Sequence, residues 1–217
     1  MKKLTLMMIL MALLGFNASA HGLDRTKIAE KPAEVTPILI GETVPDVTLF
    51  STDGVPFKLR EKAAKQPTIV LFYRGGWCPF CNAQLSQIQA AEEQIRELGY
   101  QIIAISPDTP DELNKSITDK KLDYQLASDF SLETIRKFGL AFYVPKEYSD
   151  KIKSVGGQTH YLEGDSRSIL PVPAVFILDQ AGSIQFEYVN PNYKVRVNPQ
   201  LLVDAARYAL ENSDQTM

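Results

Sequence analysis

The sequence is poor in the residues that hold metals and in the charge that attracts nucleic acids. It contains only two cysteines and two histidines among 217 residues, and its net charge is −3. One cysteine pair and two separated histidines do not make a closed tetrahedral zinc set. The basic footprint of a nucleic-acid-binding protein is also missing. Because no nucleotide, metal or flavin motif is visible, we expect neither a cofactor nor a bound metal.

Long apolar runs are scarce as well, and the one candidate lies at the N-terminus. Lys2 and Lys3 precede an apolar run over Leu4–Phe16, and the small residues Ala18–Ala20 follow it. This order is typical of a secretory signal peptide cleaved after Ala20, and the run is shorter than the ~20 apolar residues that a spanning helix needs. We therefore predict a signal peptide over 1–20 and a periplasmic or otherwise secreted mature chain without a membrane span.

The rest of the chain predicts one domain over 41–212, preceded by a flexible lead-in segment over 21–40. Short β-branched runs bounded by turn residues indicate strands, and apolar residues at helical spacing indicate helices. The predicted strands are 47–50 and 55–59 as a hairpin, then 68–73, 100–105, 174–178 and 183–189. The predicted helices follow the strand at 68–73, begin at Thr109 and Asn198, and cover 131–138. This order predicts an α/β fold with a central mixed sheet flanked by helices.

Two parts of this pattern carry a more specific expectation. The last helix is expected to turn Leu201, Leu202, Ala205 and Tyr208 inward.

The thirty residues 141–170 show no clear pattern, and a loop of that length in a compact domain is usually functional or mobile.

Both cysteines fall in Cys78-Pro79-Phe80-Cys81, where the strand at 68–73 gives way to a helix. Proline prefers the first helical position, so Cys78 is expected at the N-cap and Cys81 one turn later, facing inward. The unpaired amides and the dipole of a helix N-terminus favour a thiolate, and we expect the pKa of Cys78 to fall toward ~6.5. Cys78 is then the attacking sulfur and Cys81 the resolving one. This mechanism requires that Cys78 be reached from solvent.

A structural disulfide is the alternative interpretation of the same pair. Closing a four-residue loop stabilises a protein by only roughly 2 kcal/mol on the chain-entropy model. A chain of this size has little need of so small a gain, so a redox role is favoured.

The stretch Phe72–Leu85, FYRGGWCPFCNAQL, resembles the thioredoxin superfamily, and specifically the peroxiredoxin-like branch of the alkyl hydroperoxide reductase and thiol-specific antioxidant group (AhpC/TSA, redoxin). Ala104–Pro107, Gly139–Phe142 and Pro173–Asp179 continue the resemblance, which covers about Gly41–Leu210. It implies a thioredoxin-like fold with an N-terminal β-hairpin of peroxiredoxin type.

The departures from this family shape the expected activity. In a peroxiredoxin the peroxidatic cysteine falls at the position of Cys81, a Thr or Ser at that of Cys78, and an arginine at that of Pro173. The resemblance therefore implies that groups which orient a peroxide are replaced here. Pro173 instead matches the cis-proline of thioredoxins, whose neighbouring backbone pairs with a substrate strand, and Trp77 matches the tryptophan that shapes their substrate surface.

We thus name Cys78 and Cys81 as candidate catalytic residues, and Trp77 and Pro173 as candidate substrate-binding residues. The plainer alternatives are a strand-start proline at Pro173 and a packing aromatic at Trp77. A few further residues have weaker arguments. Arg74 either adds charge near the thiolates or is an exposed strand-end arginine, and Arg167 is a minor candidate for the missing arginine. His160 is expected on the surface, while Tyr73 and Phe80 are expected to pack.

Two enzymatic hypotheses and one non-enzymatic hypothesis follow. The first is an extracytoplasmic thiol–disulfide oxidoreductase acting on protein or small-molecule disulfides. The alternative is a thiol-dependent peroxidase acting on hydroperoxides, with Cys81 peroxidatic and Cys78 resolving. In either case the electron donor is expected to be a thioredoxin-type protein or a small thiol. The third is a binding module with a structural disulfide.

Overall fold

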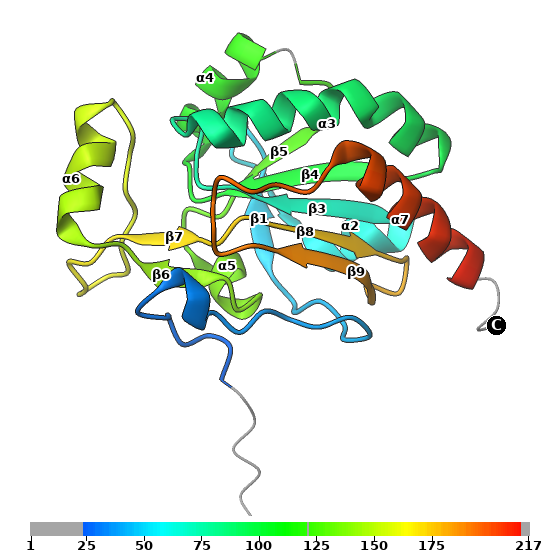
Figure 1. The fold of residues 1–217 in the computed structure, drawn as a ribbon, viewed down its shortest axis with the longest axis horizontal. Coiled ribbons are helices and arrows are strands. Elements are labelled where there is room, and N and C mark those ends of the chain that lie inside the picture. Colours follow the sequence, from blue (N-terminus) through cyan, green and yellow to red (C-terminus); the bar gives the residue numbers. More distant parts are fainter. Residues whose placement is uncertain (1–23, 121, 214–217) are drawn as a thin grey trace, which may run out of the picture.

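The computed structural model describes residues 24–120 and 122–213, so the signal peptide predicted over 1–20 lies outside the described residues. A seven-stranded mixed sheet forms its centre, in the order β2-β1-β5-β4-β3-β8-β9 (Figure 1). The strands are β1 Thr48–Phe50, β2 Pro56–Lys58, β3 Thr68–Phe72, β4 Gln101–Ser106, β5 Gln125–Ser128, β8 Ala174–Leu178 and β9 Ile184–Val189. The predicted mixed sheet and its N-terminal hairpin are confirmed, while β5 was not predicted.

The three inner strands β3, β4 and β5 are parallel, and the outer strands join them antiparallel. All five residues of β3 are buried, because helices cover both faces of the sheet. Successive side chains of a strand point to opposite faces. Ile69 and Leu71 therefore join one core layer, and Val70 and Phe72 join the other.

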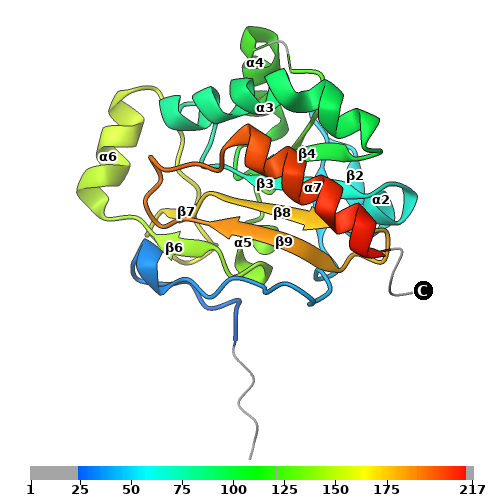
Figure 2. The same cartoon turned by 45° about the vertical axis from the view of Figure 1, so that its right-hand side comes forward.

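Two long helices, α3 (Pro79–Glu97) and α7 (Pro199–Ser213), lie together over one face of the sheet (Figure 2). The shorter α2 (Leu59–Lys65) and α5 (Glu133–Lys137) pack into the core layer of the other face, and α4 (Pro110–Lys120) follows β4. The predicted inward face of α7 is confirmed at Leu202, which is buried, and at Ala205, which packs against the core. It is wrong at Leu201 and Tyr208, which are exposed, while Val203 and Ala206 are buried. No helix in the described part of the chain has the length and apolar character to cross a bilayer.

The segment 141–170, which showed no clear pattern in the sequence, contains two short strands and a helix, and its residues 155–168 are a loop. β6 (Ala141–Tyr143) pairs with β7 (Ile169–Pro171) in a small second sheet, and α6 (Lys146–Ser154) lies between them. Both cartoon views place α6 beyond the N-terminal end of α3 (Figures 1 and 2). The sequence signal for α6 was weak, since Tyr148 and Ile152 recur at a helical interval within it but Val155, the next apolar residue, lies beyond its end and is exposed.

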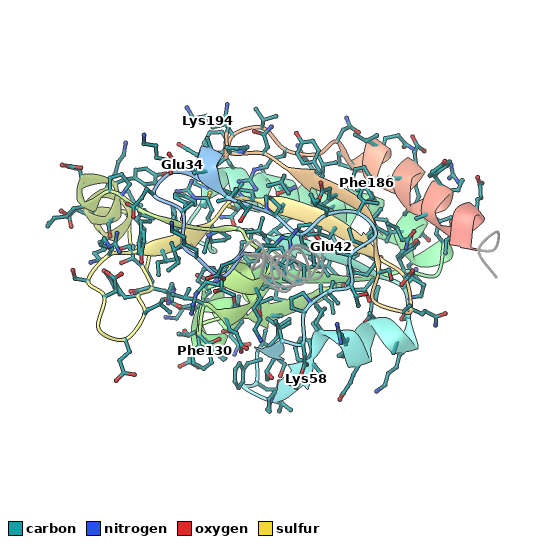
Figure 3. All side chains as sticks on the ribbon, turned by 90° about the horizontal axis from the view of Figure 1, so that it is seen from below. Glu34, Glu42, Lys58, Phe130, Phe186 and Lys194 are labelled. Carbon is teal, nitrogen blue, oxygen red and sulfur yellow. The ribbon has the colours of Figure 1, made fainter. Side chains whose placement is uncertain are left out.

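The prediction of a flexible lead-in over 21–40 was wrong for the residues that the structure describes. Ile28 and Ile38 are buried, and the amide of Thr36 donates to the carbonyl of Gly139 at 3.1 Å. Pro32–Glu34 form the short 3₁₀ helix η1. Seen from below, Glu34 and Glu42 lie over the lower face of the molecule (Figure 3). Apolar burial and backbone hydrogen bonds therefore attach this segment to the domain.

Candidate active site

Cys78 stands where β3 has ended and α3 begins. It is the N-cap of α3 with extended backbone (φ −86, ψ 114), and Pro79 is the first helical residue. Its carbonyl accepts the amide of Asn82 at 3.0 Å, which is the first hydrogen bond of the helix. Cys81 lies in the first turn and is fully buried against the sheet. The predicted positions of both sulfurs on the helix are confirmed.

The turn before Cys78 requires glycine at position 75. Gly75 has φ +137, a conformation that side chains disfavour. A Cβ there would also lie 2.5 Å from Nε1 of Trp77 and 2.8 Å from Oδ1 of Asp108. Asp108 accepts the amide of Gly76 at 2.8 Å through its other oxygen, so it fixes the same turn.

Replacing Gly75 by alanine is expected to lower the free energy of unfolding by about 2–4 kcal/mol, since backbone strain and steric overlap add. The matched control is Gly54→Ala. Gly54 has φ +78, but a methyl group added there would meet no atom within 4 Å, so this variant measures the backbone strain alone. Urea unfolding of both variants gives the comparison, and equal losses would contradict the steric role of Trp77 and Asp108.

The two thiols have opposite electrostatic environments. The pKa of Cys78 is lowered to about 6, first by a hydrogen bond from the Cys81 thiol, against the opposing effect of burial. The Cys81 amide and the charges of Arg74 and Arg196 lower it further. Burial, together with the hydrogen bond to Cys78, raises the pKa of Cys81 well above its ordinary value. Cys78 and Cys81 are not joined by a disulfide in this structure. The arrangement thus favours a Cys78 thiolate beside a Cys81 thiol.

Arg74 is a buried cation and not an exposed strand-end residue. It is 2% exposed, and its Nη2 donates to the hydroxyl of Tyr148 at 2.7 Å. Its guanidinium carbon lies 5.1 Å from the ring centre of Trp77, 5.2 Å from that of Tyr148 and 4.3 Å from that of Tyr193. Nε and Nη1 have no hydrogen-bond partner among the described residues. Of the two interpretations offered by the sequence, positive charge near the thiolates is confirmed.

A cavity of about 280 Å³ leads to Cys78, and we call it the Cys78 cavity. Arg74 and residues 77–80 line it from the start of α3, Tyr148 and Lys151 line it from α6, and Tyr193 lines it from the loop before α7. Cys78 itself is only 1% exposed. The requirement that Cys78 be open to solvent is therefore not met, because α6 and Tyr193 enclose the sulfur that the helix N-terminus presents.

Arg196 is a site residue that the sequence did not reveal. Its Nη2 lies 3.4 Å from Sγ of Cys81, and its Nη1 donates to Oε1 of Gln84 at 2.8 Å. The carbonyl of Tyr193 accepts its Nε at 2.8 Å. Arg196 is 115 residues from Cys81 in the chain and belongs to no motif, so no local signal could have found it.

Trp77 and Pro173 occupy different kinds of position. Trp77 lines the Cys78 cavity. Pro173 is buried, and the described residues contain no cis peptide bond, so the expected cis state is wrong. The amide of Val172 donates to Leu140 at 2.9 Å, and the carbonyl of Pro173 accepts from Asn190 at 3.4 Å. These backbone groups already make hydrogen bonds within the protein, so they are not free to pair with a substrate strand.

The remaining candidates lie apart from the sulfurs or pack as expected. Arg167 is on the surface, where it pairs with Asp165 at 3.1 Å and Glu30 at 3.2 Å, and it does not line the Cys78 cavity. Tyr73 packs in the core as predicted, whereas Phe80 is exposed and meets Tyr193 edge-on at 5.6 Å.

His160 is not a surface residue, since its side chain is only 14% exposed. Burial lowers its pKa, and its Nε2 lies 3.9 Å from Oε2 of Glu112. Asp108, Glu112 and His160 bring one potential ligand atom each within 4.8 Å of one another, so they are a group that could hold a cation. Glu112 already closes a capping box with Thr109, and Asp108 fixes Gly76, so both acids have structural tasks.

Comparison with known proteins agrees with this architecture. The model of the AhpC/TSA family matches residues 40–187, which is more than half of the chain. A bcp-type peroxiredoxin of Haemophilus influenzae is 22% identical over 173 residues, covering 80% of this chain and 99% of the relative.

Solved structures show the same fold at low identity. Reduced Prx3 of Vibrio vulnificus, determined in complex with hydrogen peroxide, has a TM-score of 0.65 at 16% identity, covering 79% of this chain and 97% of that one. A DsbE-type thiol:disulfide interchange protein of Chlorobium tepidum has a TM-score of 0.54 at 17% identity, covering 80% and 99%. With its thiol pair at the start of α3, the chain is a redox enzyme of thioredoxin-like fold and belongs to the AhpC/TSA family.

Proposed function

We propose that this protein is a thiol-dependent peroxidase that reduces small hydroperoxides at Cys78. The observation that carries the proposal is the position of this sulfur, which is held as a thiolate at the end of a cavity of about 280 Å³ yet is only 1% exposed. A small peroxide fits such a cavity. The disulfide of a folded protein does not reach a sulfur that is covered by α6 and Tyr193.

The reaction, reduction of a hydroperoxide, is that of the peroxidase hypothesis. The attacking sulfur, Cys78, is that of the thiol–disulfide hypothesis. The relative from Haemophilus influenzae, which is matched over 99% of its length, is a peroxiredoxin, and this supports peroxide as the substrate class. The contrast between the lowered pKa of Cys78 and the raised pKa of Cys81 supports Cys78 as the attacking sulfur. The engaged backbone of Val172 and Pro173 speaks against docking of a substrate strand, and the likeness to a DsbE-type protein concerns the fold.

One catalytic cycle consumes one hydroperoxide and two external thiols. The Cys78 thiolate attacks the terminal oxygen of ROOH and the O–O bond breaks. Cys78 becomes a sulfenic acid, and the leaving alkoxide takes a proton from solvent to give ROH. Cys81 then attacks the Cys78 sulfur, and the hydroxide that leaves combines with the Cys81 proton as water. Two external thiols reduce the Cys78–Cys81 disulfide by exchange and become a disulfide themselves.

The two arginines assist different steps. Arg74 holds positive charge beside the Cys78 thiolate and the incoming oxygens. Arg196 lies 3.4 Å from Cys81, where it favours the thiolate that forms during resolution. We also propose export from the cytoplasm, on the basis of the first twenty residues. Of the two electron donors expected from the sequence, we propose the small thiol, because the enclosure that excludes a protein disulfide from Cys78 excludes a thioredoxin-type protein as well.

The proposal is tested by assaying the purified protein separately for hydroperoxide consumption and for insulin reduction. With dithiothreitol as reductant, we expect hydrogen peroxide and cumene hydroperoxide to disappear at least about a hundredfold faster than without protein, because an activated thiolate is supplied. Insulin reduction, followed by turbidity, is expected to stay near the protein-free rate. Rapid insulin reduction without peroxide consumption would reverse the choice between the two hypotheses.

A further inference from the structure

The Cys78 cavity has a charge opposite to that of the protein as a whole. The chain has a net charge of −3, yet the described residues that line this cavity include Arg74 and Lys151 and no aspartate or glutamate. A third cation, Lys194, lies 5.9 Å from the ring of Phe80, which also lines the cavity. Figure 3 shows Lys194 toward the end of the molecule that carries α6. This local sign favours an anionic ligand.

Arg74 supplies the second and independent observation. It is 98% removed from solvent, and Nε and Nη1 have no partner among the described residues. None of the ion pairs within the described ranges includes it. A buried guanidinium with free donors is costly unless an anion compensates it, and its planar fork matches a carboxylate. The Cys78 thiolate compensates part of this charge.

The remaining walls are aromatic or aliphatic. The rings of Trp77, Phe80, Tyr148 and Tyr193 line the same cavity as Arg74 and the exposed Lys151. At about 280 Å³ the space is at the lower end of small-molecule sites and suits a compact body of roughly a dozen non-hydrogen atoms. Tyr193, whose ring centre lies 4.3 Å from the guanidinium carbon, belongs to a largely exposed loop.

We propose that the Cys78 cavity selects compact organic hydroperoxides that carry a carboxylate, which is held by Arg74 and Lys151 while the aromatic rings cover the apolar body. This inference rests on the proposed peroxidase function and specifies its substrate class. The hydroperoxide is reduced to the alcohol as described above, and the carboxylate is unchanged by the reaction.

The test compares cumene hydroperoxide with its para-carboxylate, two substrates that share the reacting group and the ring. With the intact chain and a fixed reductant, we expect kcat/KM to be about tenfold higher for the carboxylate, as befits a charge-assisted hydrogen bond. In Arg74→Met this ratio is expected to fall toward one. Any general loss of thiolate reactivity affects both substrates and cancels in the ratio, so the comparison isolates recognition of the anion.

Lys151→Gln provides a variant at an exposed position, where folding is not at risk, and we expect about a threefold decrease of the same ratio. Lys153→Gln is the matched control, because Lys153 lies on the same helix but donates to Tyr161 and does not line the cavity. Equal kcat/KM for the two substrates in the intact chain would overturn the inference while leaving the peroxidase proposal standing. Failure to reduce either substrate would instead overturn the peroxidase proposal itself.

Discussion

Replacing Cys78 by serine is expected to lower the rate of hydroperoxide consumption by at least about a thousandfold, because the thiolate that attacks the peroxide is removed. Cys81→Ser is expected to behave differently. Its Cys78 should still react with one equivalent of peroxide, and turnover should then stop because no second sulfur can form the disulfide. Stopped-flow measurement of the first turnover and a steady-state assay separate these two outcomes.

Trapping the sulfenic acid identifies the sulfur that carries it. In Cys81→Ser, dimedone added after peroxide should label Cys78, and peptide mass spectrometry locates the adduct. The reverse pattern, with turnover or labelling that survives in Cys78→Ser, would assign the peroxidatic role to Cys81, the position that the family resemblance gives it. The raised pKa and full burial of Cys81 are the reasons to expect otherwise.

Replacing Cys81 by alanine is expected to raise the pKa of Cys78 from about 6 by at least about one unit, because the hydrogen bond from the Cys81 thiol is the largest cause of its lowering. The thiolate is the reactive form, so the rate rises with pH through the pKa and is level above it. The intact chain should therefore keep about half of its maximal rate at pH 6. If the pKa of the variant returns to an ordinary ~8.5, its thiolate fraction at pH 6 falls below about 1%.

Alkylation of the reduced protein by iodoacetamide between pH 4.5 and 9.5 measures this shift directly. Cys81→Ser is the matched comparison, since a hydroxyl keeps a donor of similar position and should place the midpoint between those of the intact chain and Cys81→Ala. Identical midpoints in all three proteins would show that the helix N-terminus and the arginines suffice, and that the second thiol has no part in activating the first.

The enclosure of Cys78 depends on the segment 141–170. Its helix α6 contributes Tyr148 and Lys151 to the Cys78 cavity, and Tyr148 accepts the hydrogen bond of Arg74. A sulfur at a helix N-terminus is otherwise open, as the thiol–disulfide hypothesis assumed. Covering it with a separate helix restricts access to molecules that fit the cavity. A cysteine at a helix N-cap can therefore carry out either disulfide exchange or peroxide reduction. The elements packed around the sulfur decide which substrates reach it.

The sequence by itself determined the parts of this protein that depend on neighbours along the chain. Pro79 at the first helical position placed Cys78 at the N-cap and Cys81 inside, and the buried run at Thr68–Tyr73 located the inner strand β3. The rest was decided by tertiary structure. Arg74 meets Tyr148 across 74 residues, and Arg196 meets Cys81 across 115. Such contacts arise only when distant segments pack, so no local pattern records the cavity, its charge or the protection of its sulfur.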